Sequence, residues 1–351
     1  MKTVFEDWDW QAPARWTRIR TLDMHTGGEP LRVFTSGLPH IEGNTVLEKR
    51  RYFREHYDHI RTGTMWEPRG HADMYGAVVT PSVDADFDVF FLHNEGYSTM
   101  CGHAIIALTT LAAETGLVHH APRREDGSSE VQLTFCVPAG KIHARATLQG
   151  GKARDVTFRN VPSFSYLLDR DVEVRGIGRV RFDVAYGGAF YAVVDATQLG
   201  LKLTAEHFNQ LVDYGRRIKL AVADAFAIEH PFEKDLGLLY GTIFTGPAQQ
   251  ATHHSRNVCI FADGELDRSP TGSGVSARAA LHHAKGELQV QERITIESIL
   301  GSTMTVRATE LTKYGPYDAI IPEVGGTASI TGSHEFYFDP DDSLGHGFIF
   351  R

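Results

Sequence analysis

Cys101 is the residue whose type and setting most favour chemistry. It directly precedes an apolar run, Gly102 to Ala113, that predicts a helix. A helix N-terminus carries about half a positive charge and N–H groups that lack an intrahelical partner. Both features stabilise a thiolate, so a cysteine at such a position can have a markedly lowered pKa. We therefore interpret Cys101 as a catalytic thiol rather than as a small buried apolar side chain.

A similar helix opening occurs about half the chain length later. Residues 101–107 read CGHAIIA and residues 271–277 read TGSGVSA, so Thr271 occupies the place of Cys101. The match is either an internal repeat or two unrelated helix starts that both use glycine. Residues 267–274 could provide a helix N-cap, a phosphate loop without its usual lysine, or a carboxylate site made of backbone N–H groups. Two such helix starts facing each other would hold one carboxylate from both sides, with a thiolate beside the neighbouring carbon.

The element that carries Cys101 indicates the fold around it. A helix that is apolar on all sides is buried on all sides, which in a sheet-rich protein places it inside a barrel or a strongly curved sheet. Many short β-type runs bounded by Gly, Pro, Asn or Asp predict strands. Helices are expected at 46–57, 102–116, 204–225 and 273–286. This mixture predicts an α+β fold, and a true repeat would make it two similar halves, each with a sheet around one helix.

Composition limits the classes of function. The chain has 351 residues and a net charge of −9, from 35 Lys and Arg against 44 Asp and Glu. An acidic chain is a poor candidate for a nucleic-acid binder, and no apolar stretch approaches the ~18 residues of a membrane helix. Only three cysteines occur, which is no disulfide framework and suggests a reducing compartment. We expect a cytoplasmic protein that acts on a small molecule, in which Cys136 and Cys259 serve as packing.

Metal and nucleotide sites are not indicated. The chain contains 18 histidines, but neither an HExxH motif nor paired CxxC units. A GxGxxG fingerprint after a strand is also absent. The sequence therefore predicts neither a metal nor a cofactor.

Several motifs together resemble the proline racemase family. They run from about residue 20 to the C-terminus and are Asp23–Pro30, Glu67–Gly76, Met100–His103, Tyr186–Tyr191, His254–Val258 and Asp267–Gly272. The resemblance implies two diaminopimelate-epimerase-like halves with the active site in the cleft between them, and it suggests a homodimer. We expect the first half at 15–185 and the second at 186–335, with a tail, 336–351, that returns to the first half.

The second helix start departs from the usual family pattern. Racemases and 4-hydroxyproline epimerases of the family carry a cysteine in each half, whereas here Thr271 replaces the second one. This departure matches the branch that dehydrates trans-3-hydroxy-L-proline. The resemblance then implies that Cys101 is the base and that Asp267 holds the ring ammonium. The backbone N–H groups implied to hold the substrate carboxylate are those of Gly102, His103, Gly272 and Ser273.

A physical argument favours the same reaction. Inversion of an α-carbon needs a proton acceptor on one face and a donor on the other, and a threonine hydroxyl is a far weaker acid than a thiol. A substrate with a 3-hydroxyl can instead expel hydroxide and give 1-pyrroline-2-carboxylate. In a syn elimination one thiol could serve both steps, as the base and then, in its protonated form, as the acid that assists the departing hydroxyl. No cofactor is needed, because the two helix N-termini would stabilise the charge that develops at the carboxylate.

Two other functions stay open from the sequence. One is a slow proline racemase or hydroxyproline 2-epimerase, in which Thr271 or a water donates the second proton. The other is a non-catalytic amino-acid-binding relative. Retention of Cys101 and Asp267 speaks against the latter, because binding alone would not require a thiol.

Overall fold

One order of helices and strands occurs twice along the chain. The computed structural model describes residues 3, 6, 9–118 and 124–350. The first series consists of β1 (Thr17–Thr26), β2 (Glu29–Ser36), α1 (Val46–Met65), β3 (Tyr75–Pro81), β4 (Phe87–His93), β5 (Tyr97–Ser98), α2 (Gly102–Thr115), β6 (Ser129–Val137), β7 (Gly140–Gln149), β8 (Lys152–Arg159) and β9 (Ser163–Val174). The second consists of β10 (Gly178–Tyr186), β11 (Phe190–Asp195), α3 (Phe208–Ala225), β12 (Leu239–Gly246), β13 (Ser255–Phe261), β14 (Glu265–Leu266), α4 (Gly272–Ala284), β15 (Arg293–Glu297), β16 (Thr303–Tyr314), β17 (Tyr317–Gly326) and β18 (Ala328–Phe338).

Strand pairing repeats as well. In the first series β2 pairs parallel with β3, and β4 pairs parallel with β6. Their counterparts β11–β12 and β13–β15 are the parallel pairs of the second series. The strands that follow the central helix, β6–β7–β8 and β15–β16–β17, are antiparallel in both. The repeat suggested by residues 101–107 and 271–277 therefore extends to whole halves.

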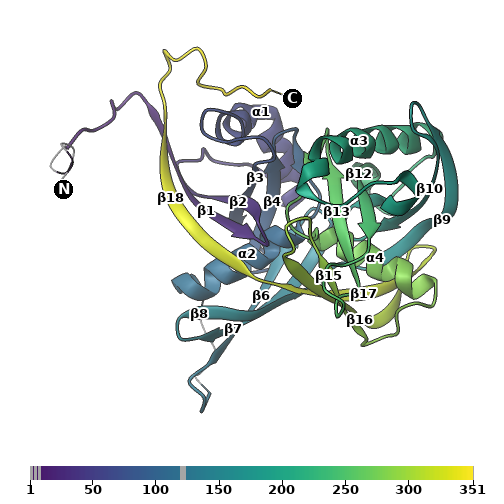
Figure 1. The fold of residues 1–351 in the computed structure, drawn as a ribbon. Coiled ribbons are helices and arrows are strands. Elements are labelled where there is room, and N and C mark those ends of the chain that lie inside the picture. The colour runs from purple at the N-terminus through teal and green to yellow at the C-terminus, as the bar shows by residue number, and fades with distance from the viewer. Residues whose placement is uncertain (1–2, 4–5, 7–8, 119–123, 351) are drawn as a thin grey trace.

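The last strand of each series crosses to the other half. β9 pairs with β10, with Val174 opposite Gly178, and β18 pairs with β1, with Phe338 opposite Thr17. β17 and β18 form the long yellow ribbon that runs from one half to the other in Figure 1. β17 also pairs with both β8 and β9. Each half thus becomes a curved ring of strands, and the predicted α+β fold of two similar halves is confirmed.

The predicted boundary between the halves, at 185/186, stays a prediction. The element order starts again at β10, whose first residue is Gly178, which favours a boundary near residue 176. The chain rejoins the first half from Ala328, at the start of β18, rather than from residue 336. Farther along the tail, the Phe348 N–H donates to the Glu67 carbonyl. Residue 351 of the predicted tail lies outside the described residues.

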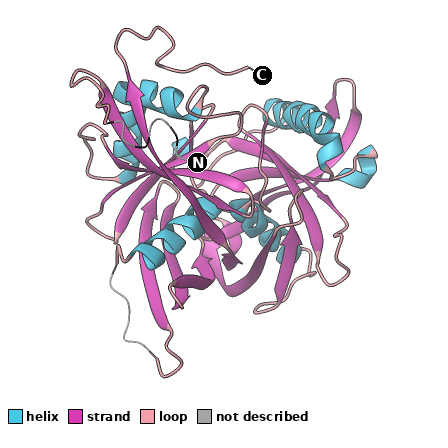
Figure 2. Ribbon diagram, turned by 60° about the vertical axis from the view of Figure 1, so that its left-hand side comes forward, coloured by secondary structure: helices cyan, strands magenta, loops and turns pink. Residues whose placement is uncertain are grey.

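The two central helices are buried, which the composition of α2 predicts. Every residue of α2 from Gly102 to Ala113 is buried, and so is every residue of α4 from Gly272 to Leu281. α2 packs against β7 and β8, and α4 packs against β9, β10, β16 and β17. α1 and α3 instead cover the strands from outside, against β4 and β12 (Figure 2). The four predicted helices are confirmed, although α1 continues to Met65, past its predicted end at 57.

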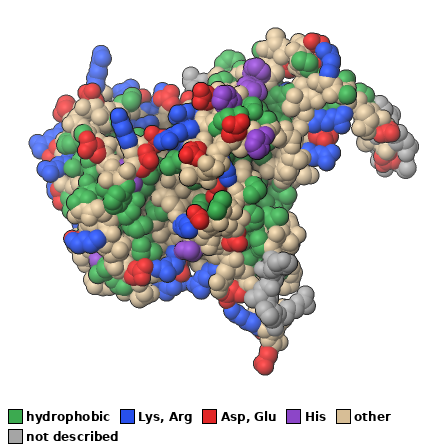
Figure 3. All heavy atoms as spheres, turned by 180° about the vertical axis from the view of Figure 1, so that it is seen from behind, with side chains coloured by type: hydrophobic (Ala, Val, Ile, Leu, Met, Phe, Trp, Pro, Cys, Tyr) green, Lys and Arg blue, Asp and Glu red, His purple; other side chains and the backbone are tan. Residues whose placement is uncertain are grey.

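The surface carries both signs of charge. On the face that Figure 3 shows, Lys and Arg side chains are interspersed with Asp and Glu, so neither sign covers it. Within the described residues, every helix is too short or too polar to cross a membrane.

Candidate active site

The starts of α2 and α4 meet between the two halves. A β-carbon added at Gly102 would lie 2.5 Å from the Gly272 Cα, and one added at Gly272 would lie 2.6 Å from the Gly102 Cα. Only glycine permits this approach of backbone to backbone. The first N–H groups of a helix have no intrahelical partner, so two sets of donors open toward one place.

All seven residues that the sequence predicts for the site line one small cavity there. They are Cys101, Gly102, His103, Asp267, Thr271, Gly272 and Ser273. A turn between β10 and β11 closes in on both helix starts. A β-carbon at Gly187 would lie 2.2 Å from the Ser273 carbonyl oxygen, and one at Gly188 would lie 2.7 Å from the Met100 Cβ. The Gly187–Gly188 pair in the motif quoted above therefore permits close packing around the cavity.

Cys101 is the N-cap residue of α2. Its Sγ accepts a hydrogen bond from the Ala104 N–H, with an N···S distance of 3.4 Å. The His103 Nδ1 lies 3.2 Å from the same sulfur. Burial lowers the pKa of His103 to about 3, so this imidazole is neutral beside the thiol. The local chain thus gives the sulfur one N–H donor and a neutral imidazole, but no cation.

The expectation of a lowered thiol pKa is wrong. Burial raises the pKa of Cys101 well above its ordinary value, and the nearby charges of Asp267 and Glu29 raise it further. The hydrogen bond from the Ala104 N–H and the nearby Tyr75 hydroxyl lower it, but burial outweighs both. The sequence reveals the helix start but not the degree of burial, and desolvation disfavours the charged form of a thiol.

Thr271 occupies the equivalent place at the start of α4 in a strained conformation. Its φ of 70° lies in the left-handed region, which is rare for a β-branched residue. The strand β13 supports it, because the Asn257 side-chain amide donates to the Pro270 carbonyl at 3.0 Å. The Thr271 Oγ1 is buried without a hydrogen-bond partner. An unpartnered buried hydroxyl is costly, and at the wall of a cavity it is available to a ligand.

Asp267 supplies a buried carboxylate to the same cavity. Its Oδ1 accepts a hydrogen bond from the Ser269 N–H at 2.7 Å. Burial raises the pKa of Asp267 to about 6, against the opposing effects of Ser269, Thr271 and Arg268. The Thr271 hydroxyl lies near enough to contribute to that pKa, although its geometry falls short of a hydrogen bond. At neutral pH the carboxylate is mostly charged, and its environment would favour a bound ammonium.

Sequence reasoning missed the apolar and phenolic wall of the cavity. The remaining lining residues are Tyr75, Met100, Tyr191, Tyr240 and Phe261. Tyr75 and Tyr191 lie within motifs quoted above, but nothing in their spacing assigned them a role. Tyr240 and Phe261 lie outside every motif, on β12 and β13. Only the packing of distant strands brings these rings together, so the sequence contained no local signal for them.

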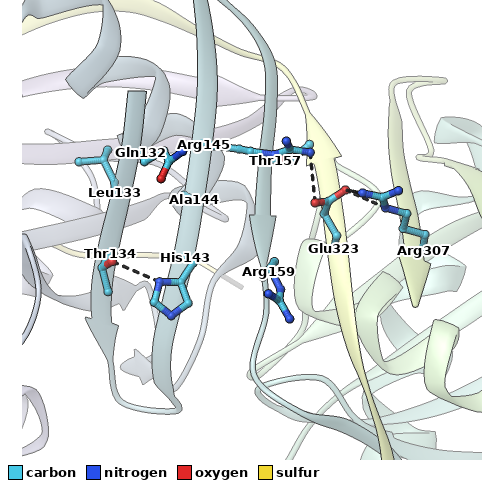
Figure 4. Close-up of a pocket in the computed structure, with 10 residues that line it drawn as sticks. All are labelled: Gln132, Leu133, Thr134, His143, Ala144, Arg145, Thr157, Arg159, Arg307 and Glu323. Atoms are coloured by element: carbon cyan, nitrogen blue, oxygen red, sulfur yellow. Dashed lines mark hydrogen bonds and ion pairs between the residues drawn. The ribbon is translucent and has the colours of Figure 1, made fainter. Parts of the chain in front are cut away.

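A larger cavity lies away from the helix starts, on strands β6, β7, β8, β16 and β17 (Figure 4). There the Glu323 carboxylate accepts hydrogen bonds from Arg145 at 3.3 Å and from Arg307 at 2.9 Å. Its ten lining residues include none of the predicted site residues. Within the described residues, no cluster of three or more His, Cys, Asp or Glu side chains could hold a metal ion.

Comparison with known proteins agrees with this architecture. Residues 21–349 match the family model described as proline racemase. A trans-3-hydroxy-L-proline dehydratase of Colwellia psychrerythraea is 49% identical over 99% of this chain and 97% of its own length. A human protein of the same name is 46% identical over 95% of each chain. The crystal structure of a hydroxyproline epimerase from Agrobacterium vitis, with bound trans-4-hydroxy-L-proline, has a TM-score of 0.88 and 29% identity, and the match covers 96% of both chains.

Proposed function

The chain belongs to the proline racemase family, and from that membership and the residues of the cavity we propose that it dehydrates trans-3-hydroxy-L-proline to 1-pyrroline-2-carboxylate. One observation carries the choice of reaction. A threonine stands at the second helix start, where inversion would require a proton donor as acidic as the Cys101 thiol. The names of the bacterial and human relatives support the same substrate.

In this proposal the two halves bind the zwitterionic substrate between them. The substrate carboxylate lies at the facing helix starts and accepts from the N–H groups of Gly102, His103, Gly272 and Ser273. Asp267 accepts from the ring ammonium in a charge-assisted hydrogen bond. The ammonium also offsets the Asp267 charge that raises the pKa of Cys101, so binding favours the thiolate that the reaction needs.

The reaction then proceeds as an elimination. The Cys101 thiolate takes the α-proton, and the electron pair of that bond forms a double bond between C2 and C3. The C3–O bond breaks, and the departing oxygen leaves as water once it has received a proton. The resulting enamine tautomerises to 1-pyrroline-2-carboxylate. The helix N-termini stabilise the negative charge that builds up toward the carboxylate during proton removal.

Stereochemistry favours a base and a leaving group on one side. In trans-3-hydroxy-L-proline the carboxylate and the hydroxyl are on opposite faces of the ring. The α-hydrogen and the hydroxyl are therefore on the same face, which is the face we assign to Cys101. Thr271 lies on the other face and has no proton to transfer in this scheme.

We further propose that the enzyme is a cytoplasmic homodimer. The sparse, unpaired cysteines favour a reducing, cytoplasmic location, and family resemblance favours a homodimer. We also propose that no cofactor takes part, because the scheme needs only proton transfers and the charge stabilisation that the helix N-termini supply.

One incubation tests the proposed function. Purified protein is mixed separately with trans-3-hydroxy-L-proline, trans-4-hydroxy-L-proline and L-proline, and the products are identified by mass and chiral analysis. We expect loss of water from the 3-hydroxy substrate and essentially no D-proline from L-proline. Inversion of L-proline at a rate comparable to dehydration would favour the racemase alternative. An absence of any conversion would favour a binding protein.

A further inference from the structure

Three buried hydroxyls meet at the Cys101 side of the cavity. The Tyr75 hydroxyl makes a short hydrogen bond with the Ser98 hydroxyl, and it lies 3.4 Å from the Tyr240 hydroxyl. All three side chains are less than one-tenth exposed. Tyr75 and Ser98 come from the first half and Tyr240 from the second, so closure of the two halves assembles the cluster. The scheme above leaves this cluster without a role.

Tyr75 is held close to the catalytic thiol. It lines the cavity together with Cys101, and Ser98 precedes Cys101 by three residues at the end of β5. The edge of its ring packs on His103, with 4.8 Å between ring centroids. The phenol also lies near enough to lower the pKa of Cys101, which favours the thiolate. The hydroxyl of Tyr75 therefore occupies the side of the cleft on which the α-proton leaves.

The elimination needs a proton donor at that place, and Cys101 can act as one only after it has taken the α-proton. Hydroxide is a poor leaving group, and a proton delivered to it in the transition state accelerates such a step by roughly 10²- to 10⁴-fold. The other hydroxyls that line the cavity are poorly placed. The Tyr191 hydroxyl is hydrogen-bonded to the Ser273 hydroxyl at 2.7 Å, at the start of α4. Thr271 lies at the same helix start, on the side of the cavity opposite Cys101. His103 is neutral, and its Nδ1 lies 3.2 Å from the Cys101 sulfur.

We propose that Tyr75 is the general acid that protonates the departing 3-hydroxyl, with Ser98 and Tyr240 fixing its orientation. This assignment rests on the proposed function and adds a second catalytic residue to it. Burial raises the pKa of Tyr75 well above its ordinary value, so the phenol enters the reaction protonated.

The protons balance over one turnover. The Cys101 thiolate takes the α-proton and becomes a thiol. The oxygen on C3 takes the Tyr75 proton as the C3–O bond breaks and leaves as water, which makes Tyr75 a phenolate. The thiol then returns its proton to the phenolate, which lines the same cavity, so both residues regain their starting states. The α-proton is thereby relayed to the leaving group without a large movement of the sulfur.

The test compares two leaving groups in Tyr75→Phe. The variant keeps the ring and its packing but loses the acidic hydrogen. We expect dehydration of trans-3-hydroxy-L-proline to fall by about 100-fold or more in kcat. Release of fluoride from trans-3-fluoro-L-proline, which needs no proton on its leaving group, should fall by less than about tenfold. Water loss is followed by mass analysis, and fluoride by an ion-selective electrode.

Tyr191→Phe is the matched control, because it also removes a phenol from the cavity wall. It should change the two rates by the same factor. Equal losses for both leaving groups in Tyr75→Phe would overturn the general-acid assignment and leave Tyr75 a packing residue. Failure of the unmodified enzyme to release either water or fluoride would instead overturn the proposed function, and the assignment with it.

Discussion

The starts of α2 and α4 are equivalent in the repeat, yet they differ in what they offer a substrate. Cys101 has an ordinary extended backbone, and its sulfur caps the helix by accepting from the Ala104 N–H. Thr271 adopts a left-handed backbone, and its hydroxyl makes no cap. Both starts keep the glycine that lets them touch. The duplicated scaffold thus preserves two helix starts that face each other, while only one of them carries the residue that we propose as the base.

The rest of the cavity wall follows the same division. The first half supplies Cys101 and Tyr75, which we assign to proton transfer. The second half supplies Asp267 and the Tyr191–Ser273 pair, which are suited to binding. A site with proton chemistry on one side can remove a proton and a leaving group from one face. It cannot easily deliver a proton to the opposite face, which is what separates elimination from inversion.

The largest expected effect comes from removing the proposed base, Cys101. Cys101→Ala should lower dehydration by about 10³-fold or more, because the variant retains the binding groups but has no acceptor for the α-proton. The measurement is kcat by pyrroline formation, with the fold checked by thermal unfolding. Cys259→Ala is the control, since it removes another buried thiol and should affect stability more than kcat. Residual activity above a few per cent in Cys101→Ala would contradict a thiolate base.

Asp267→Asn tests the binding side with a smaller expected effect. Losing a hydrogen bond between charged groups costs about 1.5–3 kcal/mol, so KM should rise roughly ten- to two-hundred-fold. The pH dependence of kcat/KM gives a second measurement. Asp267 has a raised pKa of about 6, so its charge is present above that pH and is lost as the pH falls through it.

The raised pKa of Cys101 adds a separate dependence, because the thiolate fraction increases with pH throughout the neutral range. The logarithm of kcat/KM should therefore rise with a slope of about two below pH 6 and about one above it. In Asp267→Asn the steeper part should disappear. A KM within twofold of the unmodified enzyme would remove Asp267 from the site.

The central helices and the two helix starts could be predicted from local patterns, whereas the roles of Asp267 and of the four backbone N–H groups came from the family resemblance. An apolar run with no polar face must be buried, and a glycine after Cys101 or Thr271 marks a helix start. The exchange of β9 and β18 between the halves depends on long-range pairing, which leaves no local trace. The pKa of Cys101 could not be predicted either, because it is set by burial among side chains that arrive from distant strands. The sequence places Tyr75 in a motif, but it does not indicate that the Ser98 and Tyr240 hydroxyls lie beside the Tyr75 hydroxyl.

The smallest expected effect comes from making the two helix starts alike. Thr271→Cys places a thiol on the far face at about the same volume, where the N-terminus of α4 would help to stabilise its charged form. We expect a detectable gain of epimerisation of L-proline or trans-4-hydroxy-L-proline, at a rate well below that of dehydration, because the ring pocket is not shaped for the inverted product. Chiral analysis of the recovered amino acid measures the gain.

The control is Thr271→Ser, which keeps a hydroxyl and should produce no inversion. In heavy water, the unmodified enzyme should exchange the α-proton of L-proline with retention, since Cys101 returns a solvent-derived proton to the same face. Inversion that appears equally in Thr271→Ser and Thr271→Cys would show that a water, and not the residue at 271, serves the second face.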